Sequence, residues 1–474
     1  MIAAATAGGG ARLQRLLPQP LRAVSRRAAT PVFWLWARRR HDRAPLVLLV
    51  LVSLFSLGAR LWWINKPLDG HGHSALIFDE QYYVNAARVI LGIHPTGSYT
   101  SAALFHDPNA EHPPLAKLLI ALSMKVFGDN AWGWRIFPVI FGSLALLAMY
   151  WLVRSAKGNR WLALGAASLF AVDNLMLIQG RIALLDIFTV TFMLVATALY
   201  LREQYLLAGI ALGVGLCTKL SALNLYFVII LIELIWLLWP SRDEVRSRWR
   251  VLRSRVVPVL QFGGVSLITY IAVLYVLDLI ASPIGGPGSC ATAPGGFHNP
   301  IEHTNFMLCY AGKLTNPSGP TGIASYPWQW LLNMVTINYY TVSTTVTSGG
   351  QVVATYPIIS FQGEMNPAII FLALPAFAVA LRGMWVERDV FSALCVAWML
   401  GTFLPFVVGA APLGTYGNRT SYLYYMVVVL PGVFAAVAQL FSRRWLPVAA
   451  VLGYVCILGY WFVTIYPFRT WSGS

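Results

Sequence analysis

The sequence predicts an all-α polytopic membrane protein with about eleven transmembrane helices and two large extracytoplasmic loops. Of its 474 residues, 58% are hydrophobic and only 11% are charged. With a mean hydropathy of +0.64, the chain lacks the polar surface that a soluble domain requires. Long apolar runs recur along it, and basic residues cluster between them.

The apolar runs that are long enough to cross about 30 Å of hydrocarbon lie near residues 45–65, 132–153, 161–178, 182–201, 204–218, 222–240, 259–281, 367–382, 389–409, 422–441 and 446–467. If the Arg-rich N-terminus is cytoplasmic, this order also places the basic segments 154–160, 242–255 and 443–444 on the cytoplasmic side, as the positive-inside rule predicts. The formal net charge of +16 then reflects membrane topology, and nucleic-acid binding is not expected.

The first long loop, 66–131, lies on the opposite side and has two segments of helical character. Spaced apolar positions predict a helix over 79–91 that lies along the membrane interface. Pro113-Pro114 precede a second helix over 115–127, which is too short to span.

The second long loop, 282–366, is rich in Gly, Pro, Thr and Ser, and we expect Gly349-Gly350 to act as a hinge in it. Cys290 and Cys309 flank a polar stretch of this loop. They can form a disulfide if the loop is extracytoplasmic.

Charged residues in the first loop stand out because the chain otherwise avoids charge. They are the carboxylate pair Asp79-Glu80 and part of the segment His112-Pro113-Pro114-Leu115-Ala116-Lys117. The outer ends of several spans add further cations, so that this side collects His112, Lys117, Arg135, Arg181, Lys219 and Arg419. Lys and Arg anchors favour cytoplasmic ends, so the gathering predicts a shared site for an anion such as a lipid-linked phosphate. The structural alternatives are a solvated helix N-terminus for the acids and snorkelling anchors for Lys117 and Arg135.

The segment from Gln179 to Asp186 places Arg181 and Asp186 at the outer end of the fourth predicted span. A carboxylate buried there needs a partner, and we expect Asp173 to serve the same polar cluster. A purely structural ion pair is the alternative.

Histidines also crowd the two long loops: His71, His73, His94, His106, His112, His298 and His303. Their spacing is unspecific, so no metal site is assigned.

Four ordered motifs resemble the protein O-mannosyltransferase family. They are Phe78-Asp79-Glu80, His112 to Lys117, Gly133-Trp134-Arg135-Ile136-Phe137-Pro138, and Gln179-Gly-Arg181 with Leu184-Leu185-Asp186; weaker echoes lie at 325–330 and 419–425. The resemblance implies the C-type glycosyltransferase fold and transfer of mannose from polyprenyl-phosphate-mannose to Ser or Thr of secreted or membrane proteins, with inversion. The sequence departs from the family in two places. Its second loop is too short for the separate sugar-binding-like domain of eukaryotic members, which indicates a bacterial-type member. Gln81-Tyr82-Tyr83, after the acids, differ from the eukaryotic pattern.

The resemblance also implies roles for single residues. Asp79 is the expected base, and Glu80 is expected to orient an arginine or the acceptor. Donor-phosphate or sugar binding is expected from His112, Lys117, Arg135, Gln179, Arg181, Asp186, Lys219 and Arg419. Lys117 and Arg135 rank first as phosphate ligands. No cofactor is required, although the paired acids and histidines leave a divalent metal open.

These expectations divide the chain into four parts. Residues 1–44 form a basic cytoplasmic tail, and 45–281 form a catalytic transmembrane module that includes the first loop. Residues 282–366 form the second loop, and 367–474 form the C-terminal transmembrane helices. The expected location is the plasma (cytoplasmic) membrane, with the active site on the extracytoplasmic face. The expected partners are the lipid-linked donor, an acceptor protein or peptide and the bilayer.

Two other hypotheses remain from the sequence. A related transferase would use another lipid-linked sugar, or a lipid or cell-wall glycan acceptor, as the aminoarabinose transferases of lipid A do. A secondary transporter would use Asp79, Asp186 and Glu233 as ion sites. Transporters place such groups near the membrane midplane, often in repeated halves, whereas these acids gather mainly at one surface and no repeat is present.

Overall fold

The computed structural model describes residues 43–69, 72–238, 248–284, 290, 297–348, 350–411, 418–442 and 446–470. Nearly all of the expected basic tail, His71 and Gly349 lie outside these residues.

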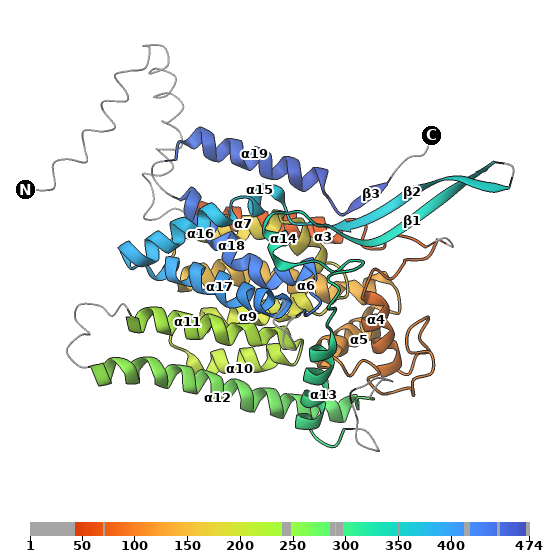
Figure 1. Cartoon of the computed structure of the whole chain (residues 1–474), viewed down its shortest axis with the longest axis horizontal. Helices are drawn as coiled ribbons and strands as arrows, with labels where there is room; N and C mark the ends of the chain where they lie inside the picture. Colours follow the sequence, from red (N-terminus) through yellow and green to blue (C-terminus); the bar gives the residue numbers. More distant parts are fainter. Residues whose placement is uncertain are drawn as a thin grey trace, which may run out of the picture.

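Apolar helices form a bundle whose members run roughly along the horizontal axis of Figure 1. In the described residues they are α3 (Ala44–Leu61), α6 (Ala131–Ser155), α7 (Arg160–Val172), α9 (Asp186–Tyr200), α10 (Tyr205–Leu216), α11 (Asn224–Leu238), α12 (Arg248–Ile280), α16 (Ala373–Arg382), α17 (Val390–Ala410), α18 (Met426–Phe441) and α19 (Val448–Thr464). One lies in each predicted span. Seven helical stretches of the described chain are long and apolar enough to cross a membrane, whereas α7, α9, α10 and α19 are shorter. The protein is therefore a multi-pass membrane protein, but the count of eleven spans is not confirmed.

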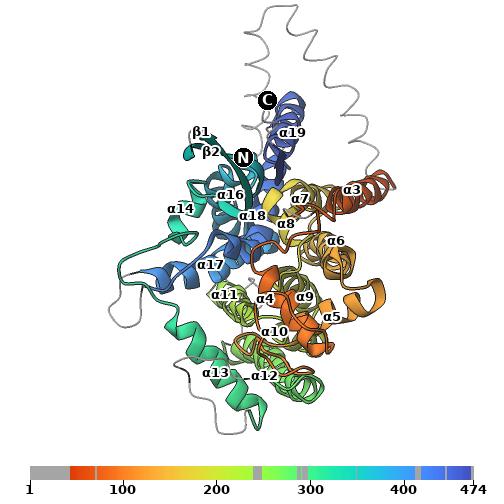
Figure 2. The same ribbon diagram turned by 90° about the vertical axis from the view of Figure 1, so that its right-hand side faces the viewer.

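Shorter helical elements connect these helices or lie at their ends. They are α4 (Glu80–Ile90), α5 (Leu115–Phe127), α8 (Asn174–Gln179), η1 (Leu220–Leu223), α13 (Pro300–Lys313), α14 (Pro327–Leu331), α15 (Pro367–Ile370), η3 (Gly383–Glu387) and η5 (Leu423–Tyr425). Figure 1 shows α4, α5 and α13 at one end of the bundle, the end that faces the viewer in Figure 2.

Both helices predicted in the first long loop are present as α4 and α5. Pro114 directly precedes the first residue of α5. Proline is common at the start of a helix, because the N–H that it lacks would have no partner within the helix there. The two helices pack together, and α4 buries Val84, Ala86 and Ala87 completely. α4 is therefore largely buried in the protein, and only Gln81 and Tyr82 in its first turn are exposed.

A three-stranded antiparallel sheet is the main feature that the sequence analysis missed. Strands β1 (Ile337–Ser348) and β2 (Gln351–Gly363) form a long hairpin that projects from the bundle in Figure 1, and β3 (Phe468–Thr470) adds to β2. Ser348 pairs with Gln351 across the turn. Gly350 has a φ of +79° in this turn, so the predicted hinge is instead the tight connection of a hairpin. Cys290 and Cys309 form the disulfide that was considered for this loop.

Candidate active site

Asp79 sits at the N-terminal end of α4, where it occupies the cap position. The preceding residue, Phe78, has a φ of +53°, in the left-handed region, which costs a bulky side chain about 1–2 kcal/mol. Its ring is held edge-on by Tyr339 and Tyr424, at centroid distances of 5.0 and 5.7 Å. Strain of this kind persists where packing over-determines the backbone, and here it fixes the position from which the Asp79 carboxyl group projects.

The Asp79 carboxylate accepts no hydrogen bond within the described part of the chain, and it does not cap its own helix. Burial raises the pKa of Asp79 to about 6; Lys219 lowers it and Asp186 raises it by smaller amounts. A carboxylate with free lone pairs and a pKa close to neutral pH is suited to accept a proton.

Lys219 and Asp186 form a buried ion pair near Asp79. Lys219 follows α10, and its Nζ donates to both oxygens of Asp186 at 2.8 and 2.9 Å. The ammonium also faces the rings of Tyr424 and Tyr425 at 5.2 and 5.7 Å. Since an ammonium has three N–H donors, one remains without a partner among the described residues. The predicted polar pairing of Asp186 is present, but its partner is Lys219.

His112 lies in the same cluster, with its ring 5.9 Å from that of Tyr83 and 6.5 Å from that of Tyr310. Burial, together with Lys219 and Lys117, holds the pKa of His112 well below its ordinary value. The imidazole is therefore neutral at neutral pH and acts as a hydrogen-bonding group, not as a cation.

Tyrosines surround the Asp79 carboxylate. Burial raises the pKa of Tyr83, Tyr310 and Tyr339, and the charge of Asp79 adds a smaller contribution; Tyr422 and Tyr424 also experience this charge. These tyrosines come from α4, α13, β1 and the segment that includes η5. The site therefore draws on residues of 45–281 and on later segments, one of which also contains the expected site residue Arg419.

Glu80 differs from its neighbour because every lone-pair direction of its fully buried carboxylate is used. Arg135 donates to it in a bidentate arrangement, with Nε 2.9 Å from Oε1 and Nη2 2.7 Å from Oε2. The backbone N–H groups of Ala183 and Ile77 donate to the same two oxygens at 2.8 and 2.7 Å. Glu80 thus orients an arginine, one of the two roles expected of it, and holds three chain segments together beside Asp79.

Arg135 was ranked first for phosphate binding, and the structure contradicts that ranking. Besides Glu80, its guanidinium donates to the carbonyls of Ile64, Lys66 and Ala75 at 2.6, 3.1 and 2.8 Å. Its side chain is 0% exposed. All five donors of a guanidinium are thus occupied, and none is left for a phosphate.

Lys117 is excluded for the same reason. Its completely buried ammonium pairs with Asp107 and donates to the backbone carbonyls of Asn109 and His112. It therefore fixes the loop that carries His112. Sequence analysis missed Asp107, whose partner is ten residues away along the chain.

The remaining expected residues are spread around this cluster. Gln179 is buried and donates to the Tyr339 hydroxyl at 3.2 Å. Arg181 is buried and donates to Tyr466 and to the carbonyls of Trp62 and Trp63. Arg181 thus ties α3 to the C-terminal segment and has little access to a ligand.

Arg419 is only half-buried, and its guanidinium donates to the carbonyl of Ala311 at 2.7 Å. Tyr422 experiences the charges of both Asp79 and Arg419. Arg419 and Lys219 are thus the expected cations that keep donors available near Asp79.

Asp173 does not join this cluster. It caps α8 by accepting from the Met176 N–H, and it also accepts from the Asn366 N–H, both at 3.0 Å. Its role is structural. The described residues contain no group of three or more His, Cys, Asp or Glu side chains placed to hold a metal ion.

Comparisons with known proteins agree with the fold and with the motifs. A family model described as dolichyl-phosphate-mannose-protein mannosyltransferase matches residues 124–277. The polyprenol-phosphate-mannose–protein mannosyltransferase of Mycolicibacterium smegmatis is 24% identical over 479 aligned positions, which cover 89% of this chain and 88% of that protein. The corresponding protein of Corynebacterium glutamicum is 25% identical and covers 83% of this chain and 82% of its own.

The S. cerevisiae protein O-mannosyltransferase Pmt1-Pmt2 complex bound to the sugar donor contains a chain that matches with a TM-score of 0.65 and 14% identity, over 91% of both chains. The protein has the C-type glycosyltransferase fold, as predicted. Within that fold, it is similar to protein O-mannosyltransferases, the family that its motifs resemble.

Proposed function

We propose that this enzyme transfers mannose from polyprenyl-phosphate-mannose to Ser or Thr hydroxyls of secreted or membrane proteins, with inversion at the anomeric carbon. The observation that carries the proposal is the unbonded Asp79 carboxylate beside the partly free ammonium of Lys219. Inverting transfer requires such a pair, a base for the acceptor and a cation for the leaving phosphate. The names of the relatives supply the sugar and the acceptor class.

The reaction proceeds in one displacement. The acceptor hydroxyl oxygen bonds to the anomeric carbon, and its proton passes to the Asp79 carboxylate. The bond between the anomeric carbon and the phosphate oxygen breaks on the opposite face, and the electron pair leaves with polyprenyl phosphate. The donor carries its own leaving group, so the displacement involves the donor, the acceptor hydroxyl and side chains of this chain.

We assign the developing phosphate charge to Lys219 and Arg419. Preorganised donors aimed at a developing charge stabilise the transition state more strongly than they would in water. Lys219 is held by Asp186, and Asp186 itself is the first residue of α9. The neutral ring of His112 and the surrounding tyrosines supply hydrogen bonds and aromatic faces for the sugar.

Lys219→Met is expected to weaken donor binding by about tenfold to a hundredfold, because it removes a charge-assisted hydrogen bond. The measurement is the equilibrium affinity for polyprenyl-phosphate-mannose. Asp186→Asn is the matched control, since it leaves the ammonium free and should preserve or tighten donor binding. Equal donor affinity in Lys219→Met and the wild type would move the phosphate to Arg419 or elsewhere.

The transfer rate is expected to rise with pH and to reach half of its plateau near pH 6. The base must be ionised to accept a proton, and burial raises the pKa of Asp79 to about 6. Below that pH the carboxyl group is protonated and inactive; above it, the rate becomes independent of this group. The profile of kcat/KM between pH 4.5 and 8 checks the prediction, and a flat profile would argue against Asp79 as the base.

We further propose that the active site faces the extracytoplasmic side of the plasma membrane. The basic segment around Arg154 and Arg160 lies at the end of α6 and the start of α7, away from Arg135 at the first turns of α6. The positive-inside rule makes the Arg154 end cytoplasmic. The disulfide between Cys290 and Cys309 also suits an oxidising compartment on the other side.

A panel of donors and acceptors tests the proposed substrates. Purified protein is incubated with polyprenyl phosphate bearing mannose or another hexose, and with a Ser/Thr-rich peptide, its Ala-substituted counterpart, or a lipid or cell-wall glycan acceptor. Transfer is expected with mannose and the Ser/Thr peptide only. Transfer to the lipid or glycan acceptor, or from another sugar alone, would replace this proposal with the related transferase.

A further inference from the structure

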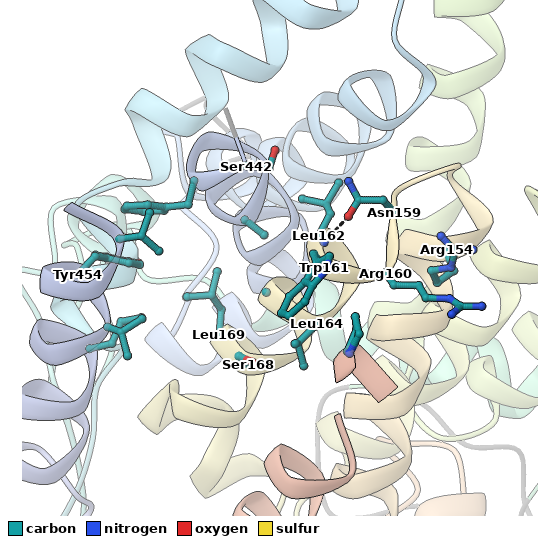
Figure 3. A pocket seen from close by; sticks show the side chains of 17 residues that line it. Arg154, Asn159, Arg160, Trp161, Leu162, Leu164, Ser168, Leu169, Ser442 and Tyr454 are labelled. Carbon is teal, nitrogen blue, oxygen red and sulfur yellow. Dashed lines mark hydrogen bonds between the residues drawn. The ribbon is translucent and has the colours of Figure 1, made fainter. Parts of the chain in front are cut away.

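A cavity of about 740 Å³ lies at the end of the bundle opposite Asp79. It is bordered by Pro45 at the start of α3, Arg160 at the start of α7 and Phe441 at the end of α18. α19 forms its far wall, shown with Tyr454 in Figure 3. Of α19, only Leu458 and Phe462 are buried, so this helix stands off from the bundle and leaves the cavity between itself and α7 and α18.

The deep part of the cavity is apolar. Its lining includes Leu164, Leu169, Ala438, Val451, Val455 and Leu458. Tyr454 also lines it, but its ring stacks on Phe441 and its hydroxyl donates to the Ala368 carbonyl, so its polar atom is satisfied. A space of this kind, within the range of about 300–1,000 Å³ typical of ligand sites, favours a hydrocarbon occupant over water.

The other part of the cavity is basic. Arg154 and Arg160 line it beside Asn159 and Trp161, and Figure 3 shows both guanidinium groups on the side away from Tyr454. Arg160 is exposed and makes no ion pair or side-chain hydrogen bond within the described residues. Arg154 donates one bond, to the Gly158 carbonyl. Among the described lining residues there is no Asp or Glu to neutralise either arginine.

We propose that this cavity binds an anionic membrane lipid, with its phosphate at Arg160 and Arg154 and a hydrocarbon chain between α7, α18 and α19. The combination of an apolar interior and an unneutralised basic mouth matches a lipid molecule from chain to headgroup. The flanking helices belong to a multi-pass membrane protein, and α3 exposes Val47, Val50 and Leu54 beside it. Lipid is thus the solvent already in contact with this face.

This site is separate from the donor site. Lys219 faces Tyr424 and Tyr425 at the N-terminal end of α18, whereas Phe441 at the C-terminal end of α18 borders the cavity, so both lipids can be bound at once. The inference rests on the membrane-spanning fold and the cavity, and it stands whether or not the transferred sugar is mannose. The bound lipid holds α19 against α7 and α18.

Native mass spectrometry of the purified full-length protein tests the inference by titration with phosphatidylglycerol or phosphatidylcholine of the same chain length. The wild type should bind phosphatidylglycerol about tenfold more tightly than phosphatidylcholine. Arg160→Gln should weaken phosphatidylglycerol binding about fivefold and phosphatidylcholine binding less, because the choline cation of the latter offsets its phosphate charge. Val455→Trp, which fills the apolar part, should weaken binding of both lipids about tenfold.

Arg253→Gln is the matched control, because Arg253 is an exposed arginine near the corresponding end of α12 and does not line the cavity. It should bind both lipids like the wild type. Glycerol phosphate, which has the charge but no chain, should not compete. Equal lipid binding by the wild type, Arg160→Gln and Val455→Trp would overturn the inference. Weakening in Arg253→Gln equal to that in Arg160→Gln would do the same, since it would show only a general effect of charge.

Discussion

Asp79→Asn is expected to lower kcat by a factor of about 10² to 10⁴, the usual contribution of a positioned general base. The amide has nearly the shape of the carboxylate but cannot take the acceptor proton. Because the Asp79 side chain makes no hydrogen bond in the described structure, its replacement breaks no contact that holds the fold. The donor affinity and the melting temperature should therefore stay close to those of the wild type.

The measurement is kcat and donor affinity in parallel, with Asp69→Asn as the control. Asp69 lies in the same loop, and its side chain is 36% exposed, so its neutralisation should leave turnover unchanged. If Asp79→Asn turns over at the wild-type rate, the base must be another group.

Glu80→Gln, in contrast to Asp79→Asn, is expected to cause a large loss of stability. Each oxygen of Glu80 receives one N–H from Arg135 and one from the backbone. A Gln side chain must therefore turn its NH₂ toward two donors and leave the buried guanidinium of Arg135 without its counter-charge. Breaking a buried ion pair of this kind costs about 3–5 kcal/mol of unfolding free energy.

Reversible denaturant unfolding in detergent measures this loss, and Glu387→Gln provides the comparison. Glu387 pairs with Arg382 on the surface, with side-chain exposures of 39% and 69%, so its change should cost no more than about 1 kcal/mol. A Glu80→Gln protein as stable as the wild type but without turnover would instead make Glu80 a second catalytic carboxylate.

The bundle could be predicted from sequence because membrane spans follow from local hydropathy. α5 begins where Pro113-Pro114 end, and each predicted run contains an apolar helix. The sheet was missed although the signal was present, since residues 337–348 and 351–363 are rich in β-branched and aromatic residues around a Gly350 turn. The Gly-, Thr- and Ser-rich composition was interpreted as a loop with a hinge, whereas residues 337–348 and 351–363 form paired strands.

The structure brings several of the motif residues close to Asp79, but the contacts that each of them makes could not be predicted. Arg135 and Glu80 are separated by 55 positions, and the partner of Lys219 is 33 positions away. Sequence spacing shows that such charges lie on one side of the membrane but not which of them neutralise each other. That pairing separates the structural cations Arg135 and Lys117 from Lys219, whose ammonium keeps a free donor.

The most direct test of the account is transfer of label from radiolabelled polyprenyl-phosphate-mannose to a Ser/Thr-rich peptide, with the wild type and Asp79→Asn side by side in a single turnover. Both proteins are first shown to bind the donor equally. The account predicts label in the peptide with the wild type and almost none with Asp79→Asn. Equal transfer by both proteins, or no transfer by a folded, donor-bound wild type, would contradict it.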